Sequence, residues 1–510
     1  MRIGRRALFG FAALFLAGAA SAAPVVHTRQ GDLAGIAQGK TDAFLGIRYA
    51  APPTGALRWR SPQPIKGWTG IRPATAFGHS CWQAVTPEGF GPWTHEYVTQ
   101  GDISEDCLFL NVWAPAHATD KLPVLVWIYG GGFNSGSGAI PIYDGRALAA
   151  RGIVVVNLNY RVGVFGFLAH PDLTKEAAGG ANSNFGLQDM IAALKWVRAN
   201  IAAFHGDPDK VTIAGQSAGS MAVHDLITSP LAKGLFARAI GESGLPDPAR
   251  TPKLAAAEAD GVAFAQSKGA HSIADLRAMS AEDLAASKGG NAIRFGPVFD
   301  GVLLPGFGPV SNVPVLAGFT ADEGSALGHD YGSSDPAQLR DLLHASFGAA
   351  EARFAPFYPT ATESERAESN RQVRRDRGAG ALLAWAGQRG DAPTYAYMWT
   401  HVEPGPQAAH WRAFHSSEIP YVFQTLGAAP ERDFSAADRA LSMRISTYWL
   451  NFVRTGDPNG AGLPRWPRFD PAAPRVQVID DAIRTQPLLP TEKLAAMRAL
   501  IAAGGQPSLF

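Results

Sequence analysis

The sequence predicts an α/β fold built on a large, mostly parallel central sheet flanked by helices. Two continuous apolar runs, 124–129 and 153–158, have the composition of strands that are buried on both faces. Apolar residues at helical spacing fill 187–201, and a short strand pattern at 211–214 precedes a helical pattern at 218–227. Strand and helix patterns that alternate in this way are typical of α/β proteins.

The rest of the chain continues this pattern and adds helical segments. A further strand is expected at 313–319 and a late amphipathic helix at 436–452. Residues 252–290 and 335–390 are rich in Ala, Glu and Arg, and we interpret them as helical excursions packed on or over the sheet. No linker or repeat divides the chain, so we expect one domain over 23–510.

Composition excludes several classes of protein. The 510 residues are 46% hydrophobic and 17% charged, which argues against disorder. The 45 Lys and Arg against 44 Asp and Glu give a formal charge of +1, unlike a nucleic-acid-binding protein. Two cysteines are too few for a disulfide framework or for a zinc module. The sequence therefore predicts no nucleic-acid partner, no metal and no cofactor.

The N-terminus has the pattern of a secretory signal peptide. Arginines within residues 1–6 precede an uncharged run, 7–20, and the small-residue site Ala20-Ser21-Ala22. A permanent membrane anchor is the alternative, but the apolar run is short for a span. We therefore expect cleavage after Ala22, a periplasmic or secreted protein without a stable membrane span, and a mature formal charge of −2, because three arginines and no acid are removed.

Export gives the two cysteines a meaning. An oxidising compartment favours a disulfide between Cys81 and Cys107, and closing a loop of that size is worth about 3 kcal/mol. The alternative is a pair of buried free thiols.

The clearest catalytic candidate is Ser217. It lies in Gly215-Gln216-Ser217-Ala218-Gly219, a G-x-S-x-G motif that is weak alone but here stands between a strand and a helix, as in a nucleophile elbow. A turn this tight requires glycine two residues either side of the serine, and the helix N-terminus faces the developing oxyanion. The alternative is an ordinary glycine turn with a capping serine.

The triple glycine Gly130-Gly131-Gly132 follows the strand 124–129 and is expected to supply part of an oxyanion hole, together with the amide of Ala218. Glycines let backbone N–H groups turn inward and approach a substrate closely. A phosphate loop would also need a lysine and a helix start that are missing here, and a generic glycine turn is the remaining alternative.

A serine nucleophile needs a base that is oriented by a carboxylate. The loop after the strand 313–319 offers Asp322 and Glu323, and spacing cannot choose between them. Chain order favours a histidine after the acid, which leaves His329, His344, His401, His410 and His415.

Several longer motifs make the chain resemble the type-B carboxylesterases, a family that includes cholinesterases and bacterial para-nitrobenzyl esterases. These motifs stand in the family's order along nearly the whole mature chain: 44–53 (FLGIRYAAPP), 104–112 (SEDCLFLNV), 159–161 (NYR) and 206–208 (GDP). The resemblance implies an α/β-hydrolase fold with helical insertions near the active site.

The resemblance also implies a serine esterase that acts on a small ester without a cofactor. Its catalytic residues would be Ser217 as nucleophile, Glu323 as acid and His415 as base, with oxyanion amides from Gly131, Gly132 and Ala218. It matches the Cys81–Cys107 pairing. The same triad could act on carbamates, amides, polyesters or long-chain lipids, and some relatives of these esterases are non-catalytic binding modules.

Three residues depart from the family pattern. Gln216 stands where Glu is usual, which weakens the case for a cationic substrate; His205 replaces a glycine; and Met190 replaces a Gln, which should affect only helix packing. The Cys81–Cys107 loop is rich in aromatic residues, and at least one is a candidate to line the substrate entrance: Trp82, Phe90, Trp93 and Tyr97.

Overall fold

The computed structural model describes residues 23–119, 121–247, 249–286, 293–308 and 311–509. The predicted signal peptide, residues 1–22, lies outside the described residues. Across the described ranges, we find no helix that combines the length and the apolar character needed to cross a membrane.

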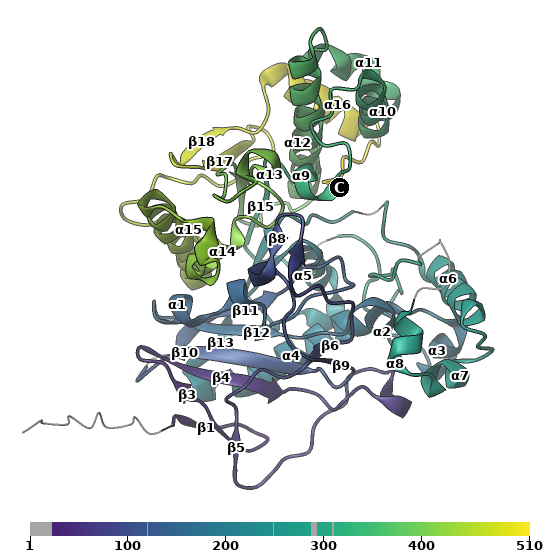
Figure 1. The fold of residues 1–510 in the computed structure, drawn as a ribbon, viewed down its shortest axis with the longest axis vertical. Helices are drawn as coiled ribbons and strands as arrows, with labels where there is room; N and C mark the ends of the chain where they lie inside the picture. Colours follow the sequence, from purple (N-terminus) through teal and green to yellow (C-terminus); the bar gives the residue numbers. More distant parts are fainter. Residues whose placement is uncertain (1–22, 120, 248, 287–292, 309–310, 510) are drawn as a thin grey trace, which may run out of the picture.

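A twisted sheet of 11 strands forms the centre of the molecule (Figure 1). From edge to edge it consists of β18 (Arg484–Pro487), β17 (Arg475–Ile479), β16 (Thr394–Trp399), β15 (Val315–Thr320), β14 (Arg238–Glu242), β13 (Gly206–Gln216), β11 (Leu122–Ile128), β12 (Val154–Leu158), β10 (Phe109–Pro115), β4 (Thr41–Arg48) and β3 (Ile36–Ala37). The strands from β12 to β17 pair in parallel, and antiparallel strands complete both edges. The predicted α/β fold with a mostly parallel sheet is confirmed.

The strands predicted from apolar runs lie in the middle of this sheet. All five residues of β12 are buried, as are the last five residues of β11, because helices cover both faces. The predicted strand 211–214 is the buried end of the longer β13, and the predicted strand 313–319 corresponds to β15. The short strands β14 and β16 were not predicted.

The helices that flank the site also begin and end close to their predicted bounds. They are α4 (Phe185–Asn200), α5 (Ala218–Thr228) and α15 (Ala436–Thr455). The side chain of Asn184 does not cap α4; its amide instead donates to the Val298 carbonyl and to Asp300, which ties a later loop to the helix start.

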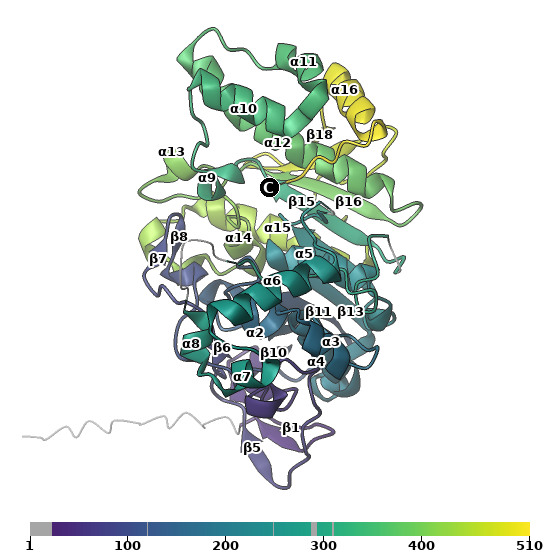
Figure 2. The same cartoon turned by 90° about the vertical axis from the view of Figure 1, so that its right-hand side faces the viewer.

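Both predicted helical excursions are helical and lie around the sheet (Figures 1 and 2). The first contains α6 (Leu254–Ser267), α7 (Ile273–Ala278) and α8 (Ala281–Ala285). The second contains α10 (Pro336–Phe347), α11 (Glu351–Phe354) and α12 (Glu363–Gly387), and it lies with α16 (Thr491–Ala502) at the end of the molecule opposite β1 (Val25–His27) and β5 (Ile71–Pro73) (Figure 2).

The predicted disulfide is present. Cys81 and Cys107 are bonded, and both are buried against the sheet. The bond closes a loop that carries the hairpin of β7 (Gly89–Phe90) and β8 (Trp93–Thr94). This hairpin reaches the functional site described below, because the indole of Trp93 donates to the backbone carbonyl of His415.

Met190 and His205, the two departures from the family pattern that lie outside the turn at Ser217, have clear structural settings. Met190 is fully buried within α4, in the main apolar core, so it acts through packing as expected. His205 ends a short 3-10 helix with φ of 65°, in the left-handed region that glycine adopts without strain.

His205→Gly is therefore expected to raise the free energy of unfolding by up to about 1 kcal/mol, since relief of left-handed strain exceeds the entropy cost of glycine. The imidazole is exposed, so little packing is lost. Urea denaturation of the wild type, His205→Gly and His205→Ala measures the effect. His205→Ala keeps the Cβ and should bring no gain; equal stability of the two variants would contradict this explanation.

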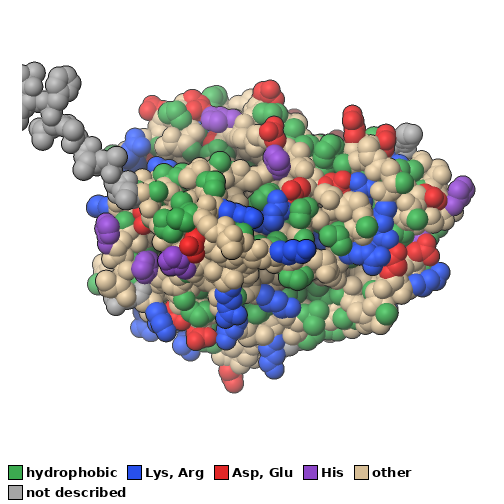
Figure 3. Space-filling model, turned by 90° about the horizontal axis from the view of Figure 1, so that it is seen from below, with side chains coloured by type: hydrophobic (Ala, Val, Ile, Leu, Met, Phe, Trp, Pro, Cys, Tyr) green, Lys and Arg blue, Asp and Glu red, His purple; other side chains and the backbone are tan. Residues whose placement is uncertain are grey.

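The face of the molecule seen in Figure 3 mixes basic, acidic and apolar side chains. This mixture agrees with the near balance of 45 Lys and Arg against 44 Asp and Glu in the chain.

Candidate active site

Ser217 occupies a strained turn between β13 and α5. Its backbone has φ of 57° and ψ of −126°, a conformation that L-residues rarely adopt. A Cβ on Gly215 would clash with Gly219, and a Cβ on Gly219 would clash with the carbonyl of Ile128. The glycines on either side are thus required by close backbone contact, as the sequence motif predicts.

The triple glycine after β11 packs directly against this turn. A Cβ on Gly130 would lie 2.7 Å from the carbonyl oxygen of Gln216 and 2.9 Å from Cβ of Ser217. Gly131 and Gly132 both have positive φ, at 106° and 62°. The structure therefore brings the glycine loop, Ser217 and the first residue of α5 together, which is the placement needed for a shared oxyanion site.

His415 and Glu323 meet beside Ser217. Nδ1 of His415 is hydrogen-bonded to Oε2 of Glu323, and both side chains are buried. The other carboxylate oxygen of Glu323 accepts from the backbone N–H of Thr320 at 2.8 Å. This second bond fixes the carboxylate at the carboxyl end of β15.

The geometry distinguishes the two acids that the sequence left open. Asp322 faces away from His415 and accepts from Nε of Arg412 at 3.1 Å and from the backbone N–H of Ala413 at 3.2 Å. It also accepts a hydrogen bond from Tyr331. Asp322 therefore anchors the loop that carries His415, while Glu323 contacts the imidazole itself.

The other histidines that follow Ser217 have different surroundings. His224 is buried against Trp385, and His401 is hydrogen-bonded to Asp438 at 2.8 Å. His344 lies 3.2 Å from Glu351, His410 packs edge-on against Trp411, and none of these contacts involves Glu323.

Two residues that the sequence singles out for other reasons, Gln216 and Trp93, contact His415. The amide nitrogen of Gln216 lies 3.1 Å from Nε2 of His415, and the ring of Trp93 packs edge-on against the imidazole. Gln216 was noted only as a departure from the family pattern. Its contact with a residue 199 positions away depends on the fold, and sequence spacing carries no signal of it.

Buried carboxylic acids lie behind the site. Burial, and then the charge of Glu323, raise the pKa of Glu418 to about 7. Tyr397 donates to Glu418 at 3.2 Å, and Trp449 donates to Glu242 at 2.6 Å. Burial, and then the charge of Glu418, also raise the pKa of Glu242 well above its usual range. Partial protonation of these acids limits the negative charge that accumulates behind Glu323.

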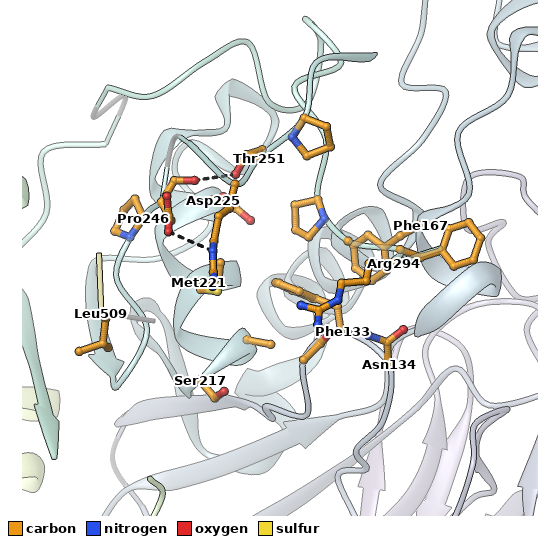
Figure 4. A pocket seen from close by; sticks show the side chains of 18 of the residues that line it. Phe133, Asn134, Phe167, Ser217, Met221, Asp225, Pro246, Thr251, Arg294 and Leu509 are labelled. Carbon is orange, nitrogen blue, oxygen red and sulfur yellow. Dashed lines mark hydrogen bonds and ion pairs between the residues drawn. The ribbon is translucent and has the colours of Figure 1, made fainter. Parts of the chain in front are cut away.

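Two cavities meet at Ser217. The larger has a volume of about 880 Å³ and includes Phe133, Met221 and Arg294 in its lining (Figure 4). The smaller has a volume of about 330 Å³ and is lined by His415 and Gln216. Three aromatic residues of the disulfide loop line the smaller cavity, namely Phe90, Trp93 and Tyr97. Trp82 instead packs against a separate apolar cluster.

Asp225 lines the larger cavity as an uncharged acid at neutral pH, because burial raises its pKa to about 8. A raised pKa stabilises the folded state most at low pH, and this stability is lost as pH rises toward 8. Asp225→Asn cannot ionise, so its free energy of unfolding should rise relative to the wild type between pH 5 and 8, by up to about 1.4 kcal/mol per pH unit.

Urea denaturation at several pH values measures this difference. Asp260→Asn is the matched control, because Asp260 is exposed on α6 beside the same cavity. If the free energies of unfolding of the wild type and Asp225→Asn changed in parallel with pH, Asp225 would not have a raised pKa in the folded state.

Two groups of side chains in the described residues place three possible metal ligands near one another: His95, Glu96 and Glu431, and His401, Asp480 and Asp481. Neither group belongs to the lining of the two cavities at Ser217. Exposed acidic clusters are common without a metal, so we assign no metal site to either group.

Comparison with known proteins identifies the family of the chain. The family model described as "Carboxylesterase family" matches residues 22–370 and 379–496. The chain is 37% identical to fumonisin B1 esterase of Sphingopyxis macrogoltabida, over 88% of this chain and 84% of the relative. It is 35% identical to para-nitrobenzyl esterase of Bacillus subtilis, over 90% of this chain and 95% of the relative.

A solved structure of a PNB esterase is similar with a TM-score of 0.78 and 32% sequence identity, covering 93% of this chain and 99% of that chain. The predicted α/β-hydrolase fold and the resemblance to type-B carboxylesterases are thereby confirmed. The chain belongs to the carboxylesterase family and is a carboxylic ester hydrolase.

Proposed function

We propose that the enzyme hydrolyses small carboxylic esters through an acyl-enzyme on Ser217, with His415 as general base and Glu323 as the orienting acid. The observation that carries this proposal is the Glu323–His415 hydrogen bond beside a strained serine turn. A nucleophile, a base and a carboxylate that fixes the base are the groups that acyl transfer requires.

Acylation begins when Ser217 Oγ attacks the ester carbonyl carbon and its proton passes to Nε2 of His415. Glu323 holds the proton on Nδ1, which leaves Nε2 free of a proton in the neutral ring, and it stabilises the imidazolium. Backbone N–H groups of Gly131, Gly132 and Ala218 stabilise the oxyanion, each worth up to about 3–4 kcal/mol.

The intermediate collapses when the bond to the alcohol oxygen breaks and His415 gives its proton to the leaving alcohol. In deacylation a water molecule gives a proton to His415, and its oxygen bonds to the acyl carbon. Ser217 then leaves and regains a proton from His415, which restores the enzyme.

Partitioning between water and methanol tests for the shared acyl-enzyme. Butyrate esters of several alcohols, including 4-nitrobenzyl alcohol, are hydrolysed with methanol present, and the ratio of methyl butyrate to butyric acid is measured. One ratio for every leaving alcohol is expected, because all of these esters give the same intermediate. A ratio that changes with the leaving alcohol would contradict the proposal.

Gln216→Glu should move the acid limb of the kcat/KM profile to higher pH by about one unit. A carboxylate in place of an amide 3.1 Å from Nε2 stabilises the imidazolium, whereas the base must be neutral to accept a proton. The same charge lies in the smaller cavity and should favour a cationic alcohol, such as choline, over a neutral one. Gln216→Met, which adds no charge, is the control; an equal shift in both variants would refute the explanation.

We also propose that residues 1–22 direct export to the periplasm or the medium and are then removed. The Cys81–Cys107 disulfide supports this proposal, because such bonds persist in oxidising compartments. N-terminal sequencing of the protein from the exported fraction should begin at Ala23. Recovery of the full-length chain in the cytoplasm alone would overturn it.

A further inference from the structure

The two cavities at Ser217 face different parts of an ester. In the proposed mechanism His415 protonates the leaving alcohol, and His415 lines the smaller cavity and not the larger one. The alcohol therefore belongs in the smaller cavity. The acyl chain extends into the larger cavity, past Ala218 and Phe133.

Four arginines belong to the lining of the larger cavity. Arg294 reaches into it beside Phe133 and Asn134, from the side opposite Leu509 (Figure 4). The other three arginines of the lining are Arg250, Arg374 and Arg377. Burial lowers the pKa of Arg377, the charges of Arg374 and Arg250 lower it further, and Asp247 opposes the shift, so these side chains lie near one another.

The lining contains four acids, Asp225, Asp247, Asp260 and Glu323, and none of them is paired with Arg294. Asp225 is protonated at neutral pH, because burial raises its pKa to about 8. Glu323 is engaged by His415, and Asp247 lies 3.8 Å from Arg250. Arg374 pairs with Asp330 at 2.6 Å. Within the described part of the chain, no hydrogen bond or ion pair to the Arg294 guanidinium is found.

Apolar side chains belong to the lining that Ser217 and Arg294 share. Phe133 and Phe167 lie beside Arg294, and Met221 lies above Ser217 in the view of Figure 4. They suit a short methylene chain that begins at the acylated serine, and a guanidinium at its far end can bind a carboxylate through two parallel hydrogen bonds.

We propose that the larger cavity binds an acyl group with a free carboxylate at its far end, held by Arg294. The preferred substrates are then monoesters of dicarboxylic acids with an uncharged alcohol. This inference rests on the proposed esterase function and adds the substrate class to it.

Monobenzyl esters of glutaric, adipic and suberic acid test the proposal. Each is compared with the neutral benzyl ester of equal chain length, for example benzyl hydrogen adipate with benzyl hexanoate, and released benzyl alcohol is measured. For the best-fitting length, kcat/KM of the acid should exceed that of its neutral partner by about tenfold, as one charge-assisted hydrogen bond implies. Benzyl 6-aminohexanoate, with a cation at the same end, should be the poorest of its length.

Arg294→Gln should remove the preference by lowering kcat/KM for the acid about tenfold more than for the neutral ester. Arg294→Lys keeps the charge and should retain part of the preference. Arg353→Gln removes an equal charge from an exposed position on α11, outside both cavity linings, and should keep the full preference. Added salt should reduce the preference of the wild type.

The outcomes separate this inference from the proposed function. Two results would contradict the carboxylate site and leave the proposed esterase function intact. In one, no ester with a free carboxylate is cleaved faster than its neutral partner. In the other, Arg294→Gln slows the charged and the neutral ester equally. If the wild type also fails to cleave benzyl hexanoate and 4-nitrobenzyl butyrate, the proposed function itself fails.

Discussion

Ser217→Ala is expected to lower kcat for ester hydrolysis by about 10⁵–10⁶-fold, because the nucleophile is lost while the base and the oxyanion amides remain. The fold should persist, since the hydroxyl makes no contact on which the turn depends: the strained backbone is held by Ser217 N–H donating to the Glu242 carbonyl at 2.8 Å. Initial rates with 4-nitrobenzyl butyrate, together with a thermal unfolding curve, measure both effects.

Ser220 provides a matched control. It lies one residue beyond Gly219 in α5 and donates its hydroxyl to the Gly244 carbonyl at 2.6 Å. Ser220→Ala should cost stability and leave most of the activity. If Ser217→Ala kept a turnover within tenfold of the wild type, Ser217 would not be the nucleophile.

Glu323→Gln is expected to lower kcat by about 10³–10⁴-fold with little change in stability. An amide no longer stabilises the imidazolium, and it can favour the wrong imidazole tautomer. The Gln carbonyl can still accept from the Thr320 N–H, so the bond that holds this loop is retained.

Asp322→Asn tests the neighbouring acid and should have the opposite profile. It weakens the bonds to Arg412 and Ala413, so the free energy of unfolding should fall by about 1–3 kcal/mol while kcat changes less than tenfold. If Asp322→Asn abolished turnover and Glu323→Gln did not, the acid would have been assigned to the wrong residue.

Sequence patterns were sufficient where one local rule determines the structure. The apolar runs of β11 and β12 indicate strands that are buried on both faces, and this is where they lie. The glycines around Ser217 are required by backbone contacts within a few residues, so the motif predicts the turn directly. The single pair of cysteines left one possible disulfide.

Contacts between distant segments could not be predicted in this way. Asp322 and Glu323 are adjacent, and only the position of the His415 loop shows which of them reaches the imidazole. Nothing in the sequence distinguishes Arg294 from the other charged residues, and only the fold shows that it lines the cavity with Phe133. The strands β14 (RAIGE) and β16 (TYAYMW) are as long as β12 and β15, but neither is a continuous run of aliphatic residues, so the strand pattern was not distinguished.

Mass spectrometry of the enzyme after reaction with a serine-directed organophosphonate tests the central claim most directly. We expect one adduct per chain, located in the peptide that contains Ser217, with loss of activity in proportion to labelling. Ser217→Ala should take up no label, while Ser220→Ala should react like the wild type. Full labelling at another serine, or activity that survives complete labelling of Ser217, would contradict an acyl-enzyme on this residue.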